Sequence, residues 1–242
     1  MSLSIVILAA GQGTRMRSDL PKVLQPLAGR PMLAHVLECA HELGADDVCV
    51  VYGHGGNAVI DAFDGEDVRW SLQAEQLGTG HAVQQAMPDT PGGNMVLILF
   101  GDVPLLTSGT LQRLIDATNE DEMSVLTVDM DDPTGYGRIV REGGDVSRIV
   151  EQKDATPEEQ SIVEINTGVM FCAAAKLKNW LGNVGNDNAQ GEYYLTDVIA
   201  MAVSDGVTVH GVKADSMVEV MGINDKKQLA EAERALQARL VD

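Results

Sequence analysis

Residues 8–22 read LAAGQGTRMRSDLPK, and this stretch decides the fold of the chain. It follows a near-continuously apolar run at 3–8, which is typical of a central parallel strand covered on both faces. Gly11 and Gly13 then interrupt the chain, and because they lack a Cβ atom, backbone N–H groups can converge there on an anion. Arg15 and Lys22 add positive charge. The stretch therefore predicts a polyphosphate site at the carboxyl end of a strand.

Three other structures use glycines in a similar way. A tight turn alone would explain Gly11 and Gly13, and this alternative stays open for the loop taken by itself. A dinucleotide-binding fingerprint would need a third glycine, but Met16 occupies that position. It would also need an acidic residue after the next strand, but Gly53 follows that strand. A P-loop needs Gly-Lys-Ser/Thr after the glycines. This tripeptide does not follow them here, so the loop is not a P-loop.

Composition and charge limit the partners of the protein. The 242 residues are enough for one large α/β domain. The net charge of −19 argues against nucleic acid or an anionic membrane surface as a partner. Long-range forces would also repel an anionic substrate. Its attraction must therefore be local, from Arg15, Lys22, backbone N–H groups and a divalent cation.

The sequence is typical of a cytoplasmic protein. Its apolar runs stay below the roughly 18 residues needed to span a bilayer, and its N-terminus lacks the pattern of a signal peptide. The cysteines are odd in number and lie in apolar segments, so we expect reduced thiols at Cys39, Cys49 and Cys172.

Strand and helix patterns alternate along the first half of the chain. Strands are predicted at 3–8, 48–52, 68–72 and 95–100, and helices at 31–43, 58–63 and 80–87. This alternation predicts right-handed crossovers and a doubly wound, mostly parallel mixed sheet. Short β-like stretches at 124–130, 138–141, 147–151 and 162–171 indicate a small β-rich lobe that covers the substrate. Two helices (176–181 and 195–203), a strand (207–212) and an amphipathic helix (225–240) complete the pattern.

Two oxygen-bearing side chains are candidate metal ligands. Asp102 comes just after the apolar strand at 95–100, where open α/β sheets place ligands. Mg²⁺ prefers one or two protein oxygens together with phosphate oxygens and water, and Asn224 could supply a second oxygen. The alternatives are a turn or cap role for Asp102 and a helix N-cap for Asn224.

Further polar blocks follow in a fixed order. They are QAEQLGTG at 73–80, FGDVPL at 100–105, GYGRIV at 135–140, VEQKDAT at 150–156, INTGV at 165–169, GEYYLTD at 191–197 and GINDKKQL at 222–229. With the opening loop, they resemble the N-acetylglucosamine-1-phosphate uridyltransferase half of the bifunctional bacterial GlmU family, across essentially the whole chain. The loop alone would fit any sugar-nucleotide, cytidylyl- or guanylyltransferase. By the same resemblance, the later blocks narrow the reaction to uridylyl transfer onto an N-acetylated amino sugar.

The resemblance implies a Rossmann-like nucleotide-diphospho-sugar transferase fold and a reaction that needs Mg²⁺. UTP and N-acetylglucosamine 1-phosphate would give UDP-N-acetylglucosamine and pyrophosphate, for peptidoglycan and lipopolysaccharide precursors. By this resemblance, the residues that contact the nucleotide are Leu8, Ala9, Ala10, Gly11, Gly13, Gln73, Gly78, Thr79, Phe100 and Gly101. The sugar-binding residues are Gly137, Glu151, Asn166, Glu192, Tyr194 and Thr196, the metal ligands are Asp102 and Asn224, and the catalytic cations are Arg15 and Lys22. Phe100 departs from the Tyr usual in the family, so a phenolic hydroxyl is lost there.

The chemistry of a sugar 1-phosphate explains this set of residues. Its second pKa lies near ~6, so the attacking oxygen is already ionised at neutral pH and no general base is required. Positioning and charge neutralisation by Mg²⁺, Arg15 and Lys22 would supply most of the acceleration. His54 and His81 lie at loop-to-helix junctions, and we expect surface or capping roles for both.

Two alternatives remain: another sugar-phosphate nucleotidyltransferase of the same fold, or a non-catalytic nucleotide-sugar-binding paralogue. The second would be expected to have lost Arg15, Lys22 or Asp102, which are all present.

The predicted nucleotidyltransferase domain spans 1–223, with a nucleotide-binding half at 1–120 and a sugar-binding half at 121–223. The helix at 224–242 would lead to the β-helix acetyltransferase domain of the bifunctional relatives. Without that domain we expect a monomer and no acetyltransferase activity.

Overall fold

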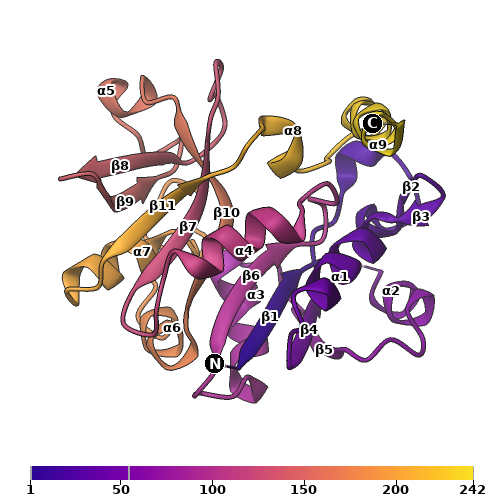
Figure 1. The fold of residues 1–242 in the computed structure, drawn as a ribbon, viewed down its shortest axis with the longest axis horizontal. Helices are drawn as coiled ribbons and strands as arrows, with labels where there is room; N and C mark the ends of the chain where they lie inside the picture. The colour runs from indigo at the N-terminus through magenta and orange to yellow at the C-terminus, as the bar shows by residue number, and fades with distance from the viewer. Residues whose placement is uncertain (1, 54, 242) are drawn as a thin grey trace.

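A mixed β-sheet with helices on both faces forms the centre of the computed structural model, which describes residues 2–53 and 55–241 (Figure 1). One half of the sheet is parallel and has the strand order β6–β1–β4–β5. These strands are β1 (Leu3–Leu8), β4 (Asp47–Tyr52), β5 (Arg69–Leu72) and β6 (Met95–Phe100). The chain moves outward from β1 to β5 and then returns to the other side of β1. The order therefore reverses between β1 and β6, where ligands bind in such sheets.

The other half of the sheet is built around an antiparallel strand. β10 (Glu164–Ala173) pairs antiparallel with β6 on one side and with β7 (Met123–Asp129) on the other, and β11 (Val209–Lys213) pairs parallel with β7. A hairpin of β8 (Arg138–Glu142) and β9 (Asp145–Val150) branches off β10. The expected mixed, Rossmann-like α/β fold is thus confirmed. β8 and β9 branch off the main path of this sheet, and the path joins strands from both sides of residue 120.

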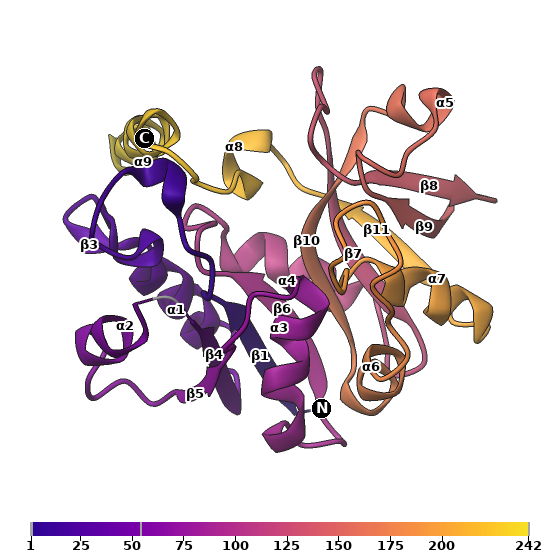
Figure 2. The same cartoon turned by 180° about the vertical axis from the view of Figure 1, so that it is seen from behind.

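The helices cover the two faces of the sheet. α1 (Met32–Glu42) and α4 (Ser108–Asp116) lie in front in Figure 1, and α3 (Thr79–Ala86) and α6 (Ala174–Leu181) lie in front in Figure 2. Along β1 the side chains alternate between two cores: Ile5 and Ile7 pack with α1 and α4, and Val6 packs with α3 and α6. Burial on both faces explains why this strand is apolar throughout.

The remaining elements are shorter or lie at the edge of the sheet. They are α2 (Gly56–Ala62), α5 (Pro157–Gln160), α7 (Asp197–Ser204), α8 (Met217–Val220), the small strands β2 (Pro26–Leu27) and β3 (Arg30–Pro31), and the 3-10 turns η1 (Thr14–Met16), η2 (Lys22–Leu24) and η3 (Met87–Asp89). The long α9 (Lys226–Val241) packs on a third core, in which Leu27, Met32, Leu105, Ile223 and Ala232 are buried.

In the described ranges the structure adds three helices, α4, α5 and α8, to the predicted elements, together with β2, β3 and the 3-10 turns, and it shifts several boundaries. Sequence patterns did not predict α4, although Thr107 is a standard N-cap whose side chain accepts a hydrogen bond from the Thr110 N–H at 3.2 Å. β10 ends at Ala173, two residues later than expected, because Met170–Ala173 pair with β6. The three cysteines are free and buried, as expected. Within the described ranges, no helix combines the length and the apolar character needed to cross a bilayer.

Candidate functional site

The carboxyl ends of β1 and β6 form the floor of the candidate site. The Gly101 N–H donates to the Leu8 carbonyl at 2.9 Å, and the Ala9 N–H donates to the Val51 carbonyl at 2.8 Å. The loop of residues 9–13 and the turn at 101–102 therefore leave the sheet at the point where the strand order reverses. This is the position that the opening loop predicted for an anionic ligand.

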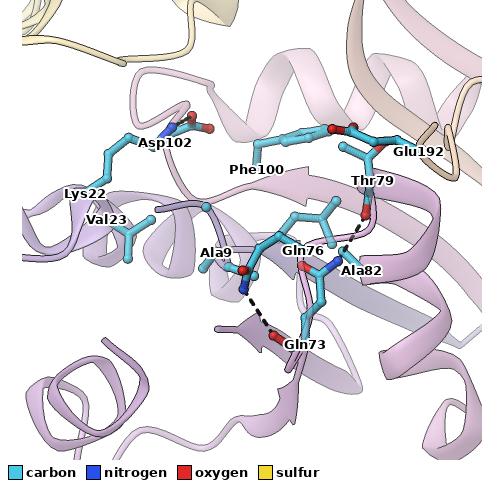
Figure 3. A pocket seen from close by; sticks show the side chains of 14 residues that line it. Ala9, Lys22, Val23, Gln73, Gln76, Thr79, Ala82, Phe100, Asp102 and Glu192 are labelled. Atoms are coloured by element: carbon cyan, nitrogen blue, oxygen red, sulfur yellow. Dashed lines mark hydrogen bonds and ion pairs between the residues drawn. The ribbon is translucent and has the colours of Figure 1, made fainter. Parts of the chain in front are cut away.

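A cavity of about 280 Å³ opens above these strand ends (Figure 3). It brings together most of the predicted nucleotide-binding residues, namely Leu8, Ala9, Ala10, Gly11, Gln73, Gly78, Thr79 and Phe100, and Lys22 and Asp102 line it as well. Gly13 and Gly101 lie in packed positions. A Cβ atom on Gly13 would be 2.5 Å from Cβ of Lys22, and one on Gly101 would be 3.2 Å from Val23. Both glycines allow close approach of the backbone to neighbouring side chains.

Two glutamines, Gln73 and Gln76, line this cavity together with Lys22. Gln73 is buried, and its Nε2 donates to the Gly78 carbonyl at 3.0 Å and lies 3.1 Å from Nδ1 of His81. Gln76 donates to the Gln73 carbonyl at 3.3 Å and lines the cavity. Sequence analysis did not single out Gln76, although a second glutamine in the same loop was an available signal. His81 supports Gln73 here, and His54 lies outside the described residues.

A second cavity, of about 190 Å³, is lined by residues predicted to bind the sugar. Gly137, Glu151, Asn166 and Thr196 lie on its wall, together with Thr79 and Phe100, which it shares with the first cavity. Two other predicted sugar residues are placed differently. Glu192 lines the first cavity, and Tyr194 is buried, with its hydroxyl accepting a hydrogen bond from Gln190 Nε2 at 2.9 Å.

Glu151 is the electrostatically perturbed group of the second cavity. Burial raises the pKa of its carboxyl above the ordinary range, and the negative charges of Asp154, Asp197 and Glu192 act in the same direction. A hydrogen bond from Thr196 Oγ1, at 3.0 Å, opposes this shift of the pKa. The pair of carboxyl and hydroxyl groups can exchange hydrogen bonds with the hydroxyls of a bound sugar.

A bulge in β10 places Asn166 at this cavity. The register between β10 and β7 shifts between Asn166 and Met170, and Asn166 Oδ1 accepts the Gly168 N–H at 3.0 Å. Gly168 has a positive φ of 88°. A Cβ atom there would be 2.5 Å from the Phe100 ring, so the bulge needs glycine and the ring packs against its backbone. Phe100 borders both cavities and a third one, of about 160 Å³, beside Asp102 and Asn224.

Lys22, Asp102 and Asn224 form a cluster that borders the first and the third cavity. The Lys22 ammonium donates to Asp102 Oδ2 and, at 3.1 Å, to Asn224 Oδ1. The side chains of Lys22 and Asp102 are only 12% and 18% exposed. The Ile223 N–H donates to the Asp102 carbonyl at 2.8 Å, which joins the two segments.

The donor set of this cluster fits Mg²⁺. One carboxylate and one amide oxygen converge on a single cation, here the ammonium of Lys22, and Mg²⁺ is commonly held by one or two such oxygens with phosphate and water completing its shell. Within the described ranges, no three His, Cys, Asp or Glu side chains gather as a metal-binding group. Lys22 thus lies at the same point as the metal candidates, whereas the sequence suggested separate roles.

Arg15, the other predicted catalytic cation, lies in a different pocket. It belongs to η1, and the pocket is open and lined by Thr14, Arg15, Met16, Arg17, Asp225, Lys226 and Lys227. Met16 is buried and anchors the turn, which leaves the arginines on either side of it exposed.

Comparisons with known proteins agree with this geometry. The family model of the MobA-like NTP transferase domain matches residues 5–169. Two proteins described as "Bifunctional protein GlmU" are similar over 98% of this chain: one from Azoarcus sp. (strain BH72), 55% identical over 239 residues, and one from Pseudomonas aeruginosa (strain LESB58), 58% identical over 238 residues. The match covers 53% and 52% of these proteins, so the chain spans about half the length of the curated relatives it matches.

A solved structure of UDP-glucose pyrophosphorylase complexed with UDP-glucose has the same fold. It superposes with a TM-score of 0.77 over 99% of this chain and 100% of the other, at 17% sequence identity.

The family model spans well over half of the sequence. It covers the opening loop, most of β1, all of β6 and Asp102. The chain therefore belongs to the MobA-like NTP transferase family.

Proposed function

We propose that this protein is a uridylyltransferase that forms UDP-N-acetylglucosamine and pyrophosphate from UTP and N-acetylglucosamine 1-phosphate. The observation that carries the proposal is a pair of adjoining cavities, the first of which contains a cation cluster. The cavities share Thr79 and Phe100, and Lys22 and Asp102 line the first of them. The names of relatives that are 55% and 58% identical support the same reading.

In the proposed reaction, a phosphate oxygen of the sugar 1-phosphate attacks the α-phosphorus of UTP. A new P–O bond forms, the bond from the α-phosphorus to the bridging oxygen breaks, and the electron pair leaves with pyrophosphate. The attacking oxygen is ionised at neutral pH, because the second pKa of a phosphate monoester is near ~6. The protein therefore needs to hold two anions together and neutralise their charge, and no proton acceptor is required.

Lys22 is suited to this task because its ammonium is mostly shielded from water, which strengthens its attraction for phosphate oxygens. Asp102 and Asn224 would hold Mg²⁺, which when bound supplies charge neutralisation at the phosphates. Lys22 could then exchange its contact with Asp102 for a phosphate oxygen. Arg15 would act from the neighbouring pocket on the outer phosphates.

The roles of the other residues follow from their cavities. In the nucleotide cavity, Gln73 would read the uracil beside Gly78 and Thr79, and Glu192 adds a carboxylate. In the sugar cavity, Asn166 and Glu151 would bind the sugar, with Gly137 and Thr196 beside them. Tyr194 would support the wall of the N-acetyl pocket from its buried position.

A substrate panel tests this proposal directly. UTP, CTP, dTTP and GTP are combined with N-acetylglucosamine 1-phosphate or glucose 1-phosphate, and pyrophosphate release is measured with and without Mg²⁺. We expect the highest kcat/KM for UTP with the N-acetylated sugar. A preference for CTP or for glucose 1-phosphate would instead support another sugar-phosphate nucleotidyltransferase. Absence of release with any pair would support the non-catalytic paralogue.

Two charge-removing variants test the catalytic assignment. Lys22→Ala and Arg15→Ala should each lower turnover by about 10²-fold or more, the effect typical of losing one preorganised charge-stabilising group. Their circular dichroism spectra should stay unchanged. Lys176→Ala, which removes a partly exposed cation paired with the exposed Asp121, is the matched control and should keep full turnover. Near-normal turnover of either site variant would contradict its assigned role.

The proposal includes a cellular setting. We place the enzyme in the cytoplasm, where its product would supply peptidoglycan and lipopolysaccharide synthesis, and we expect this chain to be a monomer. Static light scattering on the purified protein tests the last point, and a stable trimer would contradict it.

A further inference from the structure

Arg138, the first residue of β8, is buried although its side chain carries a full positive charge. It is only 1% exposed, and it is the largest of the fully buried side chains that the structure describes. The chain contains 36 acidic residues, yet none of those described lies within ion-pair distance of its guanidinium. Burying a charge without an opposite charge is costly, so the contacts of this guanidinium need an explanation.

Two oxygen atoms accept hydrogen bonds from the Arg138 guanidinium. One is the carbonyl oxygen of Tyr136, in the segment that leads into β8, and the other is Oε1 of Gln152, at 2.6 Å, just after β9. The same oxygen of Gln152 also accepts the Gly135 N–H at 3.2 Å. Nε of Arg138 is buried and has no partner in the described part of the chain. The guanidinium therefore joins residues 135–137, before β8, to Gln152, after β9.

The two segments that Arg138 joins form one wall of the sugar cavity. Residues 135–137 all line this cavity, and so does Glu151, which directly precedes Gln152. Gly137 and Glu151 lie close together, because a Cβ atom on Gly137 would be 3.3 Å from Oε1 of Glu151. The Gly137 carbonyl also accepts the Asn166 N–H at 2.9 Å. Three residues predicted to bind the sugar thus depend on the position of this wall.

Arg138 supports this wall from the side that faces away from the cavity. In the described chain, neither Arg138 nor Gln152 lines the sugar cavity, so a bound sugar would touch neither side chain. The backbone of Arg138 is fixed in the sheet, opposite Ile165 of β10 and Val150 of β9. Two of the three residues at 135–137 are glycines, which lose the most conformational freedom when they are ordered. Their position therefore depends on contacts from outside the segment.

We propose that Arg138 is a positioning residue for the sugar 1-phosphate: it fixes residues 135–137 to Gln152 and so holds Gly137 and Glu151 in place for the sugar. The inference rests on the proposed function, because that function assigns this cavity to the sugar. Arginine suits the task, since its planar guanidinium carries donors in fixed directions and can bond to two acceptors at once. An apolar side chain of similar size would fill the space but leave both acceptors without a donor.

Steady-state kinetics of Arg138→Met test this positioning role. Methionine fills a similar space but donates no hydrogen bond. We expect the KM for N-acetylglucosamine 1-phosphate to rise about tenfold, the effect typical of losing a hydrogen bond from a charged group, and the KM for UTP to stay unchanged. The matched control is Arg141→Met, which removes another arginine of β8, paired with Glu164 at 2.6 Å, and should leave both KM values unchanged. Equal KM values for the sugar phosphate in the two variants would overturn the inference.

Gln152 gives a test that leaves the buried arginine in place and applies even if Arg138→Met does not fold. Gln152→Leu removes the acceptor of Arg138 and Gly135, so it should raise the KM for the sugar phosphate in the same way. Gln152→Glu keeps an acceptor there and sets its charge beside the guanidinium, so its KM should stay close to that of the unaltered protein. Equal rises in the two Gln152 variants would contradict the positioning role, as would additive effects of Arg138→Met and Gln152→Leu.

Calorimetric titration with UDP-N-acetylglucosamine separates this inference from the proposed function, because it needs no turnover. Arg138→Met should bind the nucleotide-sugar about tenfold more weakly than the unaltered protein does, and it should bind UTP equally well. Equal affinity for the nucleotide-sugar would overturn the inference, even if uridylyl transfer proceeds normally. If the substrate panel shows a preference for glucose 1-phosphate, the proposed function fails. Weaker binding of UDP-glucose by Arg138→Met would then still support the inference, and equal binding would refute it.

Discussion

Lys22 shows at the scale of single residues how the site depends on distant parts of the chain. Its ammonium is bound by Asp102, 80 positions away, and by Asn224, 202 positions away. The sequence indicated all three residues: Lys22 in the glycine-rich loop, Asp102 after a strand and Asn224 before a helix. It assigned Lys22 to phosphate and the other two to a metal. Their direct contact means that the ammonium lies at the position proposed for Mg²⁺.

Glu151 provides a prediction about pH at the same scale. The pKa of its carboxyl is raised in the folded protein, so the folded state binds this proton more tightly than the unfolded state does. Its contribution to stability is therefore fully present below the unfolded pKa and is lost as pH rises through the folded pKa. Glu151→Gln keeps the acceptor for Thr196 but carries no charge. We expect the variant to be more stable than the unaltered protein near pH 7.5.

Urea denaturation at several pH values between 4 and 7.5 measures this difference. The gain in unfolding free energy from Glu151→Gln should shrink as pH falls, because the glutamate itself becomes protonated. Glu158→Gln, at an exposed position, is the control and should show a flat difference. A gain that is constant with pH, or a loss at pH 7.5, would contradict the assignment of a desolvated carboxyl.

At the scale of elements, the bulge in β10 connects Asn166, a proposed sugar-binding residue, to the wall formed by Phe100. Gly168→Ala combines two costs: a positive φ, unfavourable for alanine by roughly 1–2 kcal/mol, and a clash with the Phe100 ring, worth about 1–3 kcal/mol. Gly135→Ala is a close control, because Gly135 has a φ of 89° and open space around a Cβ atom.

Thermal unfolding of these two variants separates conformation from packing. Gly168→Ala should lower Tm by several degrees more than Gly135→Ala does, since each kcal/mol shifts Tm by about 2–4 °C in a domain of this size. In a Phe100→Ala background, Gly168→Ala should lower Tm by less, because the ring with which the new methyl group clashes is gone. Equal Tm values for the two single variants would show that the Phe100 contact is unimportant for stability.

Helix α9 positions the residues that precede and begin it, so its docking should affect the site. Ala232 is completely buried in the third core, whereas Ala230 on the same helix is exposed. Ala232→Leu should destabilise the protein by about 1–3 kcal/mol through overpacking, and Ala230→Leu should stay within about 0.5 kcal/mol. Urea denaturation gives both values. If Ala232→Leu proves as stable as Ala230→Leu, α9 is not packed as described.

At the scale of the whole molecule, excess negative charge opposes the compact state. A net charge of −19 repels itself, and salt shortens the range of this repulsion, from a Debye length of about 30 Å at 0.01 M to about 8 Å at 0.15 M. We therefore expect Tm to rise by a few degrees between 0.01 M and 0.15 M NaCl. Sucrose at equal osmolarity is the control and should have a smaller effect. A fall in Tm with salt would show that attractive ion pairs dominate instead.

Much of the fold was predictable because its signals are local. The apolar runs of β1 and β6 marked central strands with correct boundaries, and the glycine-rich loop after β1 marked the ligand end of the sheet. The family resemblance stated from the motif blocks is confirmed by the matched relatives. The roles of the individual site residues and the division of the domain at residues 120 and 223 stay predictions.

The sequence by itself determined the α/β class, the strand ends that form the candidate site and the residue types found there, because each depends on neighbours a few positions apart. Only the tertiary structure decided that β7 and β10 extend the central sheet, that Lys22 lies between Asp102 and Asn224, and that Arg15 faces Lys226 and Lys227 in a pocket of its own. These features depend on strand pairing and packing between segments far apart in the chain. Local patterns carry no information about which distant side chains share one cavity.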